Sequence, residues 1–285
     1  MLAKLDAAAD LKQALLRSRN EDGGWGYYAG KASRLEPTCW ALVALGAGAD
    51  DAVLRNWALK DGLLIDPNSP TPNYGFHGLA LLTLLARRAE HVASNRRLMT
   101  AIENARGVKL ADRGAVRQRN DLEAWSWMAG TFSWIEPTAW CLIALKKARS
   151  LALAVDTARL AAGDLVLFDR CCSRGGWNYG NSNMLGKELP AYVSTTALGL
   201  LALQDHRSHD AVGKSLQLLQ HEWKTETSGL ALGLSAIALR RFEVARDDVI
   251  AALHASAPTI LSLGNIHVTS VALYALAPEH DVFAF

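Results

Sequence analysis

Cysteine is scarce in this sequence, and its scarcity excludes one class of fold. Four cysteines among 285 residues are too few to form a disulfide framework in place of a hydrophobic core. Cys39 and Cys141 fall within apolar runs, where cysteine usually serves as a small core residue. Cys171 and Cys172 are adjacent, a spacing that seldom allows a disulfide between them.

A strong charge bias is also absent. The formal net charge of +2 gives no reason to expect nucleic acid or strongly acidic partners. No basic segment followed by an apolar one opens the sequence, so the cytoplasm is the expected location. Residues 255–278 lack Asp, Glu, Lys and Arg, but Pro258 and Gly264 interrupt them, and we predict no transmembrane helix there. A peripheral contact with a membrane is left open.

Strand patterns and linkers are missing as well. No stretch of useful length alternates between apolar and polar residues, and no flexible segment separates two bodies. Half of the residues are hydrophobic, which is enough to bury a large core. The chain is long for an average domain, although closed repeat rings reach this size. We therefore expect one all-α domain over residues 1–285.

The most informative feature present is a repeated segment. Glu136-Pro137-Thr138-Ala139-Trp140 matches Glu36-Pro37-Thr38-Cys39-Trp40, 100 residues earlier. Proline suits the first turn of a helix, where its missing N–H costs nothing. The residues that follow are apolar on nearly every side, so we expect each helix to be buried all round.

Weaker copies of this segment complete a series of six, each preceded by a more amphipathic stretch. We predict six helical hairpins, with inner helices that start near residues 37, 76, 137, 192, 227 and 267. Such pairs can close as an (α/α)6 toroid with the buried helices inside. An open solenoid is the alternative, but it needs polar capping repeats, and the last repeat here is among the most apolar.

The loops before the inner helices carry a further signature. Gly23-Gly24-Trp25 precedes the first inner helix, and Gly175-Gly176-Trp177 precedes the fourth. With the Pro-Thr helices, these loops resemble the prenyltransferase and squalene oxidase repeat across essentially the whole chain. That repeat builds squalene–hopene cyclases, other class II terpene cyclases and the β subunits of protein prenyltransferases. The family's repeat has a Gln before Gly-x-Trp, whereas this chain has Arg17-Ser18-Arg19 in that region.

The resemblance suggests where an acid would lie. Class II cyclases of this family carry Asp-x-Asp-Asp before Thr-Ala, and the middle Asp protonates an alkene or epoxide. Aligned on Thr138-Ala139, that motif falls on residues 134–137, of which only Glu136 is acidic. Glu136 therefore occupies the position of the proton donor, without the neighbouring aspartates. Apolar surroundings can keep such a carboxylic acid protonated.

A zinc site is not expected. Protein prenyltransferases bind zinc through an Asp and a Cys two apart and a later His. His267 lies one residue from that histidine's place, but no Asp-x-Cys pair opens an earlier inner helix. His77, Cys171, Cys172 and His267 could be combined into a ligand set only by free choice. We predict no metal and no cofactor.

The repeat register predicts which side chains converge. Two residues before the repeated threonine position, the six repeats carry Glu36, Gly75, Glu136, Ser194, Glu226 and His267. In a closed ring these residues would meet at one mouth. We predict Glu136 as the acid or base, with Glu36, Glu226 and His267 shaping the site. Acidic residues also favour the first turn of a helix for electrostatic reasons, which accounts for each glutamate singly.

Aromatic and basic residues belong to the same region. The predicted substrate-binding aromatics are Trp25, Trp40, Trp125, Trp127, Trp134, Trp140, Trp177 and Tyr179. Aromatic faces suit a lipophilic ligand, although such residues can equally pin loops to the ring. The connection with Arg106, Lys109, Arg113, Arg117 and Arg119 could neutralise an anionic head group or simply be solvated.

Two functions follow from these observations. The first is an enzyme of the terpene cyclase and prenyltransferase type that acts on a lipophilic isoprenoid substrate, by acid-initiated cyclisation in the mouth of the ring. The second is a non-catalytic toroid that binds a lipid or a protein. The length leaves a second subunit or domain open, because class II cyclases usually work at the junction of two helical domains.

Overall fold

The computed structural model describes residues 6–46, 49–66, 68–69, 71–86, 92–109, 111, 118–278 and 280–285. Within these residues it contains twelve α-helices, and the only strands form two hairpins with two residues per strand. The prediction of an all-α fold is confirmed. The hairpins are β1–β2 (Leu59–Lys60 and Leu63–Leu64) and β3–β4 (Asn183–Met184 and Lys187–Glu188).

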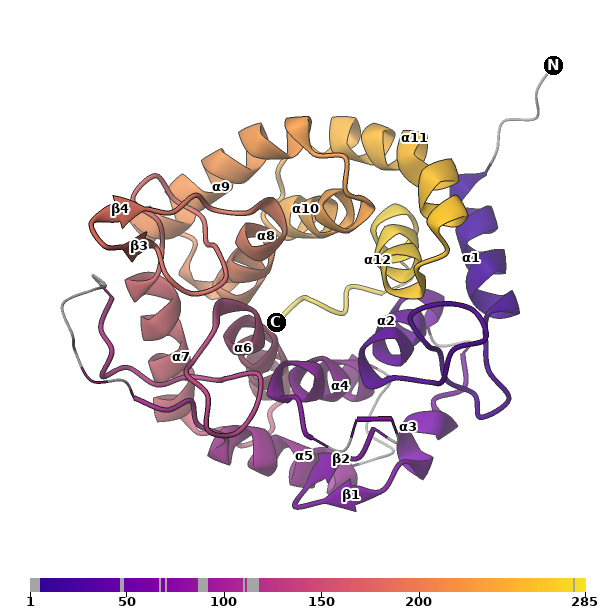
Figure 1. Cartoon of the computed structure of the whole chain (residues 1–285), viewed down its shortest axis with the longest axis horizontal. Helices are drawn as coiled ribbons and strands as arrows, with labels where there is room; N and C mark the ends of the chain where they lie inside the picture. Colours follow the sequence, from indigo (N-terminus) through magenta and orange to yellow (C-terminus); the bar gives the residue numbers. More distant parts are fainter. Residues whose placement is uncertain are drawn as a thin grey trace.

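The helices form an inner and an outer circuit (Figure 1). The inner helices are α2 (Leu35–Leu45), α4 (Tyr74–Ala86), α6 (Ile135–Ser150), α8 (Val193–Ala202), α10 (Gly229–Arg241) and α12 (Ile266–Leu276). The outer helices are α1 (Ala7–Arg17), α3 (Ala52–Asn56), α5 (Val92–Asn104), α7 (Thr157–Asp169), α9 (Asp210–Glu222) and α11 (Asp247–Leu263). Each inner helix begins within two residues of its predicted start.

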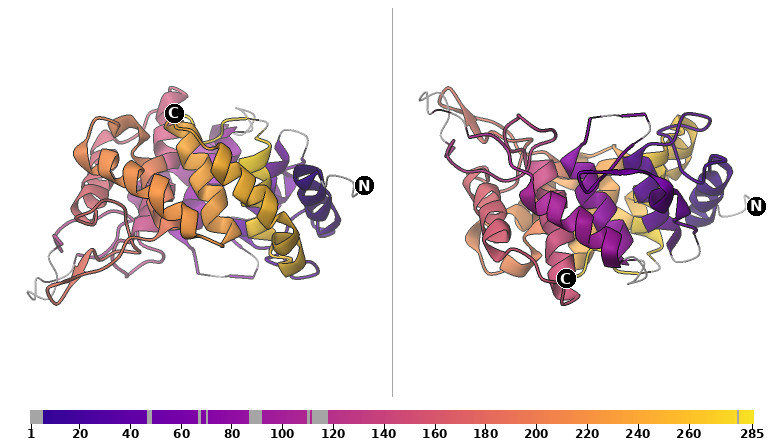
Figure 2. Two further views of the ribbon diagram at one scale, coloured as in Figure 1. Left: turned by 90° about the horizontal axis from the view of Figure 1, so that it is seen from above. Right: turned by 90° about the horizontal axis from the view of Figure 1, so that it is seen from below.

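The inner helices close a ring. Each packs against the next along the chain, and α12 packs against α2. An open superhelix would leave these two helices apart. The inner helices are buried on nearly all sides, as their uniform apolarity predicts, whereas an outer helix such as α9 buries one face through Val212, Ser215 and Leu219. Figure 2 shows that the β3–β4 hairpin and the C-terminus lie on opposite faces of the ring.

Three tryptophans fix the loops that lead into inner helices. The backbone N–H of Trp25 donates to Thr38 Oγ1 at 3.0 Å, and its indole Nε1 donates to the carbonyl of Leu15 at 2.8 Å. Trp125 and Trp177 repeat both bonds, with Thr138 and Ile102 for the former and Thr196 and Leu167 for the latter. All three indoles are fully buried.

The same loops also link neighbouring hairpins. The residue two after each tryptophan accepts a hydrogen bond from the first N–H of the preceding inner helix. Tyr27 accepts from Ile266 at 2.8 Å, Trp127 from Tyr74 at 3.0 Å, and Tyr179 from Ile135 at 3.0 Å. The first of these bonds joins the two ends of the ring, because Ile266 begins α12.

Two glycines permit this close packing. Gly176 has a φ of +77°, and a Cβ there would lie 2.7 Å from Thr196 Oγ1. A Cβ on Gly78 would lie 2.8–2.9 Å from the backbone of Trp140 and Cys141, so the backbones of α4 and α6 approach each other directly. A larger residue at Gly78 would push apart the two helices that carry Gly75 and Glu136.

Candidate acid–base site at the mouth of the ring

The second residues of the inner helices form the mouth of the ring. They are Glu36, Gly75, Glu136, Ser194, Leu230 and His267. The sequence placed five of the six in this register. It was wrong by one helical turn for Glu226, which lies at the end of a 3-10 turn before α10. Ser228 caps α10 by accepting a bond from the Ala231 N–H, so Leu230 takes the position assigned to Glu226.

Glu36 has two polar partners at the mouth. The Tyr27 hydroxyl donates to Glu36 Oε2 at 2.5 Å. His267 Nδ1 lies 3.8 Å from Glu36 Oε1, and the His267 ring stacks on Trp40 with centroids 5.9 Å apart. These contacts connect α2 with its own loop and with α12.

Glu136 has the same sequence neighbours but lacks these partners. In the loop before α6, Trp127 takes the place that Tyr27 has in the loop before α2. The helix that precedes α6 in the ring is α4, and its second residue is Gly75, whereas α12, which precedes α2, has His267 at that position. Among the residues that the structure describes, no hydrogen bond or ion pair reaches the Glu136 carboxyl. Burial, reinforced by the charge of Glu36, raises the pKa of Glu136 to about 7. The two copies of one motif therefore hold carboxyl groups in different electrostatic environments.

Two further groups of the mouth, His267 and Tyr27, are neutral near pH 7. Burial lowers the pKa of His267, and the attraction of Glu36 only partly opposes this, so the imidazole is neutral. Burial and the adjacent Glu36 raise the pKa of Tyr27, so the phenol remains a hydrogen-bond donor. A carboxyl group with a raised pKa, a neutral imidazole and a phenol thus share this region.

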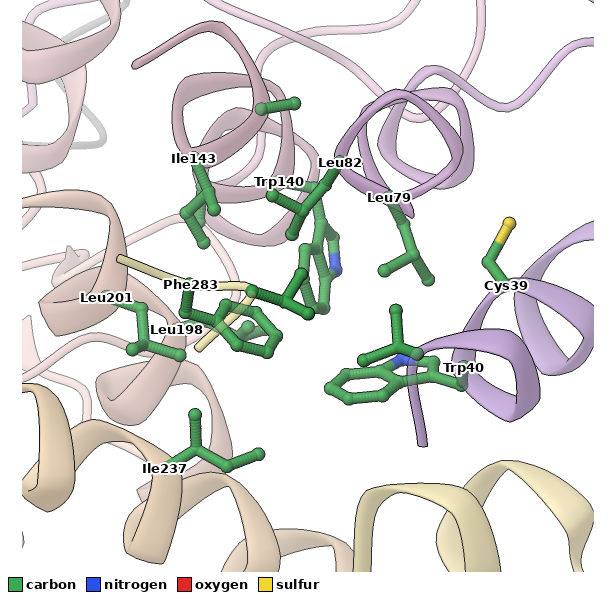
Figure 3. Packing of buried hydrophobic residues seen from close by; sticks show 14 of the residues in the cluster. Cys39, Trp40, Leu79, Leu82, Trp140, Ile143, Leu198, Leu201, Ile237 and Phe283 are labelled. Atoms are coloured by element: carbon green, nitrogen blue, oxygen red, sulfur yellow. The ribbon is translucent and has the colours of Figure 1, made fainter. Parts of the chain in front are cut away.

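Aromatic and aliphatic side chains form the floor beneath the mouth (Figure 3). Trp40 and Trp140, the sixth residues of α2 and α6, meet edge to face with centroids 5.7 Å apart. Leu79 and Leu198 occupy the sixth position in α4 and α8, and Leu82, Ile143, Leu201 and Ile237 form the next layer. Trp40 is fully buried, and its Nε1 has no hydrogen-bond partner within the described part of the chain. The site therefore combines an ionisable rim with an apolar floor.

The remaining predicted aromatics divide into two groups. Trp25, Trp125 and Trp177 are pinned in the core by their loop contacts, so they offer no surface to a substrate, contrary to the prediction. The others lie in and beside the loops around the mouth, where Trp127 packs on Phe76, Trp134 on Phe132 and Tyr179 on Tyr192. Trp40 and Trp140 are the predicted aromatics that lie directly below the glutamates.

The predicted basic loop does not gather its described cations. Arg106 and Lys109 both pair with Glu123, and Arg119 pairs with Asp121 at 2.7 Å. Arg113 and Arg117 lie outside the described residues. Each described cation of this loop therefore already has a carboxylate beside it.

The candidate metal ligands are dispersed. Both ring nitrogens of His77 face backbone carbonyls, of Asn73 at 2.6 Å and Leu64 at 2.9 Å, while Cys171 lies beside Ser215. In the described ranges no three His, Cys, Asp or Glu side chains come together as a metal-ligand set. In the same ranges no helix combines the length and apolarity needed to cross a membrane.

Sequence reasoning missed two contributors to the site. Tyr27 was not predicted as the partner of Glu36, although the first repeat has Tyr27 where the other repeat has Trp127, and this difference was a usable signal. Phe283, whose ring packs on Trp40 with centroids 5.9 Å apart, lies after the last repeat and had no repeat position to identify it.

Comparison with known proteins returns no match, either to a family model or to a curated protein. The function must therefore be inferred from the chemistry of the mouth.

Proposed function

We propose that this chain is an enzyme that donates a proton from Glu136 to an oxygen of a lipophilic, isoprenoid-like substrate. The observation that carries the proposal is the Glu136 carboxyl group, which lacks a polar partner among the described residues and has a pKa raised to about 7. A general acid works best when its pKa lies near the working pH. At pH 7 about half of the molecules would hold this proton at the edge of an apolar floor.

The raised pKa also limits the chemistry. A carboxyl group with a pKa of about 7 is a weaker acid than an ordinary one, so an alkene carbon is a poor acceptor for its proton. An epoxide or hydroxyl oxygen is a better one. The proton passes to oxygen, the C–O bond breaks with its electron pair on oxygen, and positive charge develops on carbon. The faces of Trp40 and Trp140, which Phe283 covers in this structure, would stabilise that charge once they are exposed to the substrate.

The second half of the reaction falls to the other side of the mouth. His267 is neutral and stacks on Trp40, so it can accept a proton from the carbon skeleton as a double bond forms. Glu36, 3.8 Å from His267, would stabilise the imidazolium that results. The resemblance of Glu136 to the proton donor of class II cyclases supports the same assignment.

The test compares Glu136→Gln with Glu36→Gln, because the two residues share a local sequence. Turnover is measured on a panel of isoprenoid alcohols and epoxides. We expect Glu136→Gln to lower the rate by about 10²–10⁴-fold, since an amide has no proton to donate. In Glu36→Gln the amide oxygen still accepts the Tyr27 bond, so we expect a smaller loss.

The pH profile supplies a second readout. Wild-type turnover should fall as pH rises through about 7, as Glu136 loses its proton. Equal and small effects of both substitutions would remove Glu136 from the mechanism. If wild type and Glu136→Gln bind isoprenoids equally well and neither turns them over, the result would favour the non-catalytic lipid-binding alternative.

A further inference from the structure

The segment formed by residues 280–285 lies inside the ring (Figure 1), and it follows the end of α12 that is opposite to His267 and the mouth. It places Phe283 in the centre, where the side chain is fully buried. The Phe283 ring packs against Trp40, Trp140 and Tyr274, with centroid separations of 5.9, 6.2 and 5.5 Å. The floor of the acid–base site therefore rests on a residue that comes from outside the six hairpins.

Polar contacts at the far rim hold this segment. Arg241 donates to Asp281 Oδ2 at 2.6 Å, and Lys147 Nζ donates to the Ala284 carbonyl at 2.6 Å. Lys147 and Arg241 occupy the same position, the thirteenth, in α6 and α10. Gln204 Nε2 adds a bond to the Phe283 carbonyl at 2.8 Å. The Arg241–Asp281 pair is partly exposed to solvent, so it is a modest restraint that water can replace.

The space around Phe283 is suited to an apolar ligand that carries a hydrogen-bond acceptor. Its walls are the aliphatic side chains of the sixth and ninth positions of the inner helices. Trp40 Nε1 is buried there without a partner among the described residues, and a buried donor left unpaired is unfavourable. Phe283 fills the apolar volume but offers no acceptor through its side chain.

We propose that residues 280–285 are an intramolecular plug, in which Phe283 occupies the interior that the apolar part of a ligand would need. Withdrawal of the segment would deepen the mouth site by two layers of side chains and expose the Trp40 N–H to an acceptor on the ligand. The isoprenoid nature of the ligand rests on the proposed function. The existence of the plug does not.

The decisive variant is Asp281→Asn, which removes the ion pairs to Arg240 and Arg241 without shortening any side chain of the core. Binding of farnesol is measured by isothermal titration calorimetry on the full chain. If the plug closes the interior, the apparent affinity is reduced by the fraction of molecules that are open, so weakening an anchor should tighten binding. We expect about a 2- to 5-fold lower Kd for Asp281→Asn than for wild type, in line with the modest strength of a partly exposed ion pair.

Glu243→Gln is the matched control. It removes the exposed Arg207–Glu243 contact of 3.5 Å, which lies outside the anchors of the plug, and it should leave the farnesol Kd unchanged. Phe283→Ala should bind farnesol more tightly still, although the space it opens would attract an apolar molecule in any case. Asp281→Asn therefore decides the matter even if Phe283→Ala fails to fold.

An unchanged farnesol Kd in folded Asp281→Asn, or an equal gain in Glu243→Gln, would overturn the proposal. Dodecanol serves as a straight-chain probe. If Asp281→Asn tightens dodecanol and farnesol equally, the plug stands and the isoprenoid specificity of the proposed function fails. If Asp281→Asn binds farnesol more tightly but not dodecanol, the plug and the isoprenoid specificity are both supported.

Discussion

At the scale of single residues, two identical motifs differ because their spatial neighbours differ. Glu36 meets a phenol and an imidazole, whereas Glu136 meets an indole and a glycine in the corresponding places. The first carboxyl group has two polar partners. The second is held in an apolar site without a partner among the described residues, an arrangement that costs stability and favours reactivity.

The effect of Glu136 on the free energy of unfolding should depend on pH in a defined direction. Its pKa is about 7 in the folded chain against 4.5 when unperturbed, so the folded state binds the proton more tightly. Wild type should therefore lose stability as pH rises from about 4.5 to 7. Glu136→Gln should be as stable as wild type at pH 4 and more stable by about 1–3 kcal/mol at pH 8.

Urea unfolding at pH 4, 6 and 8 measures this difference. Glu36→Gln serves as the control, because Glu36 has its two partners and should not show the same gain. A stability difference for Glu136→Gln that is constant across this range would contradict the assigned pKa.

At the scale of elements, a hydrogen bond between a loop tryptophan and a helix threonine recurs in three repeats and fixes the loop to the inner helix. Each threonine hydroxyl at the fourth position of α2, α6 or α8 accepts the N–H of a buried tryptophan. This arrangement gives Trp and Thr a shared structural role, which explains why they recur together in the repeats. The signature that resembles a family of enzymes is, in this chain, a signature of the fold.

Adjacent threonines in α8 allow a matched test. Thr196→Val leaves the buried Trp177 N–H without its acceptor and should destabilise the chain by about 1–3 kcal/mol. Thr195 is equally buried, but its hydroxyl has no partner among the described residues, so Thr195→Val should be neutral or stabilising. Chemical denaturation of both variants decides, and similar losses in the two would contradict the fastening role of Thr196.

The elements were the most predictable level of this structure. Inner helices are buried all round, so their starts could be read from unbroken apolar runs that follow Pro or Thr. The register of α10 failed because Ser228 fits either a helix cap or the repeated threonine position, and local sequence does not separate the two. The contact of Glu36 with His267 and the position of Phe283 depend on ring closure, which acts between residues far apart in the chain.

At the scale of the whole molecule, one buried cation joins three consecutive elements. Lys146, at the end of α6, donates to Asp164 Oδ1 of α7 at 2.8 Å and to Asp205 Oδ1 at 2.6 Å. A third bond, at 2.8 Å, reaches the carbonyl of Ala202 at the end of α8. The ammonium group is fully buried, so its three acceptors replace water completely.

Lys146→Met should therefore destabilise the chain strongly. It leaves two partly buried carboxylates without their shared cation, and loss of one member of a buried pair costs about 3–5 kcal/mol. Lys214→Met is the control, because the 2.6 Å contact of Lys214 with Asp210 is exposed to solvent and should contribute little to stability. Urea unfolding compares the two, and equal losses would show that Lys146 is no more than a surface charge.

The bond from the Ile266 N–H to the Tyr27 carbonyl has a consequence for how the chain acquires its structure. Its two ends are 239 positions apart in the sequence. During synthesis, α2 would be complete long before α12 emerges, and its apolar flank would stay uncovered for most of translation. Contacts between such distant residues also slow folding, because a long loop must close before they form. The flank of the first hairpin is thus the surface most in need of protection by a chaperone while the chain is being made.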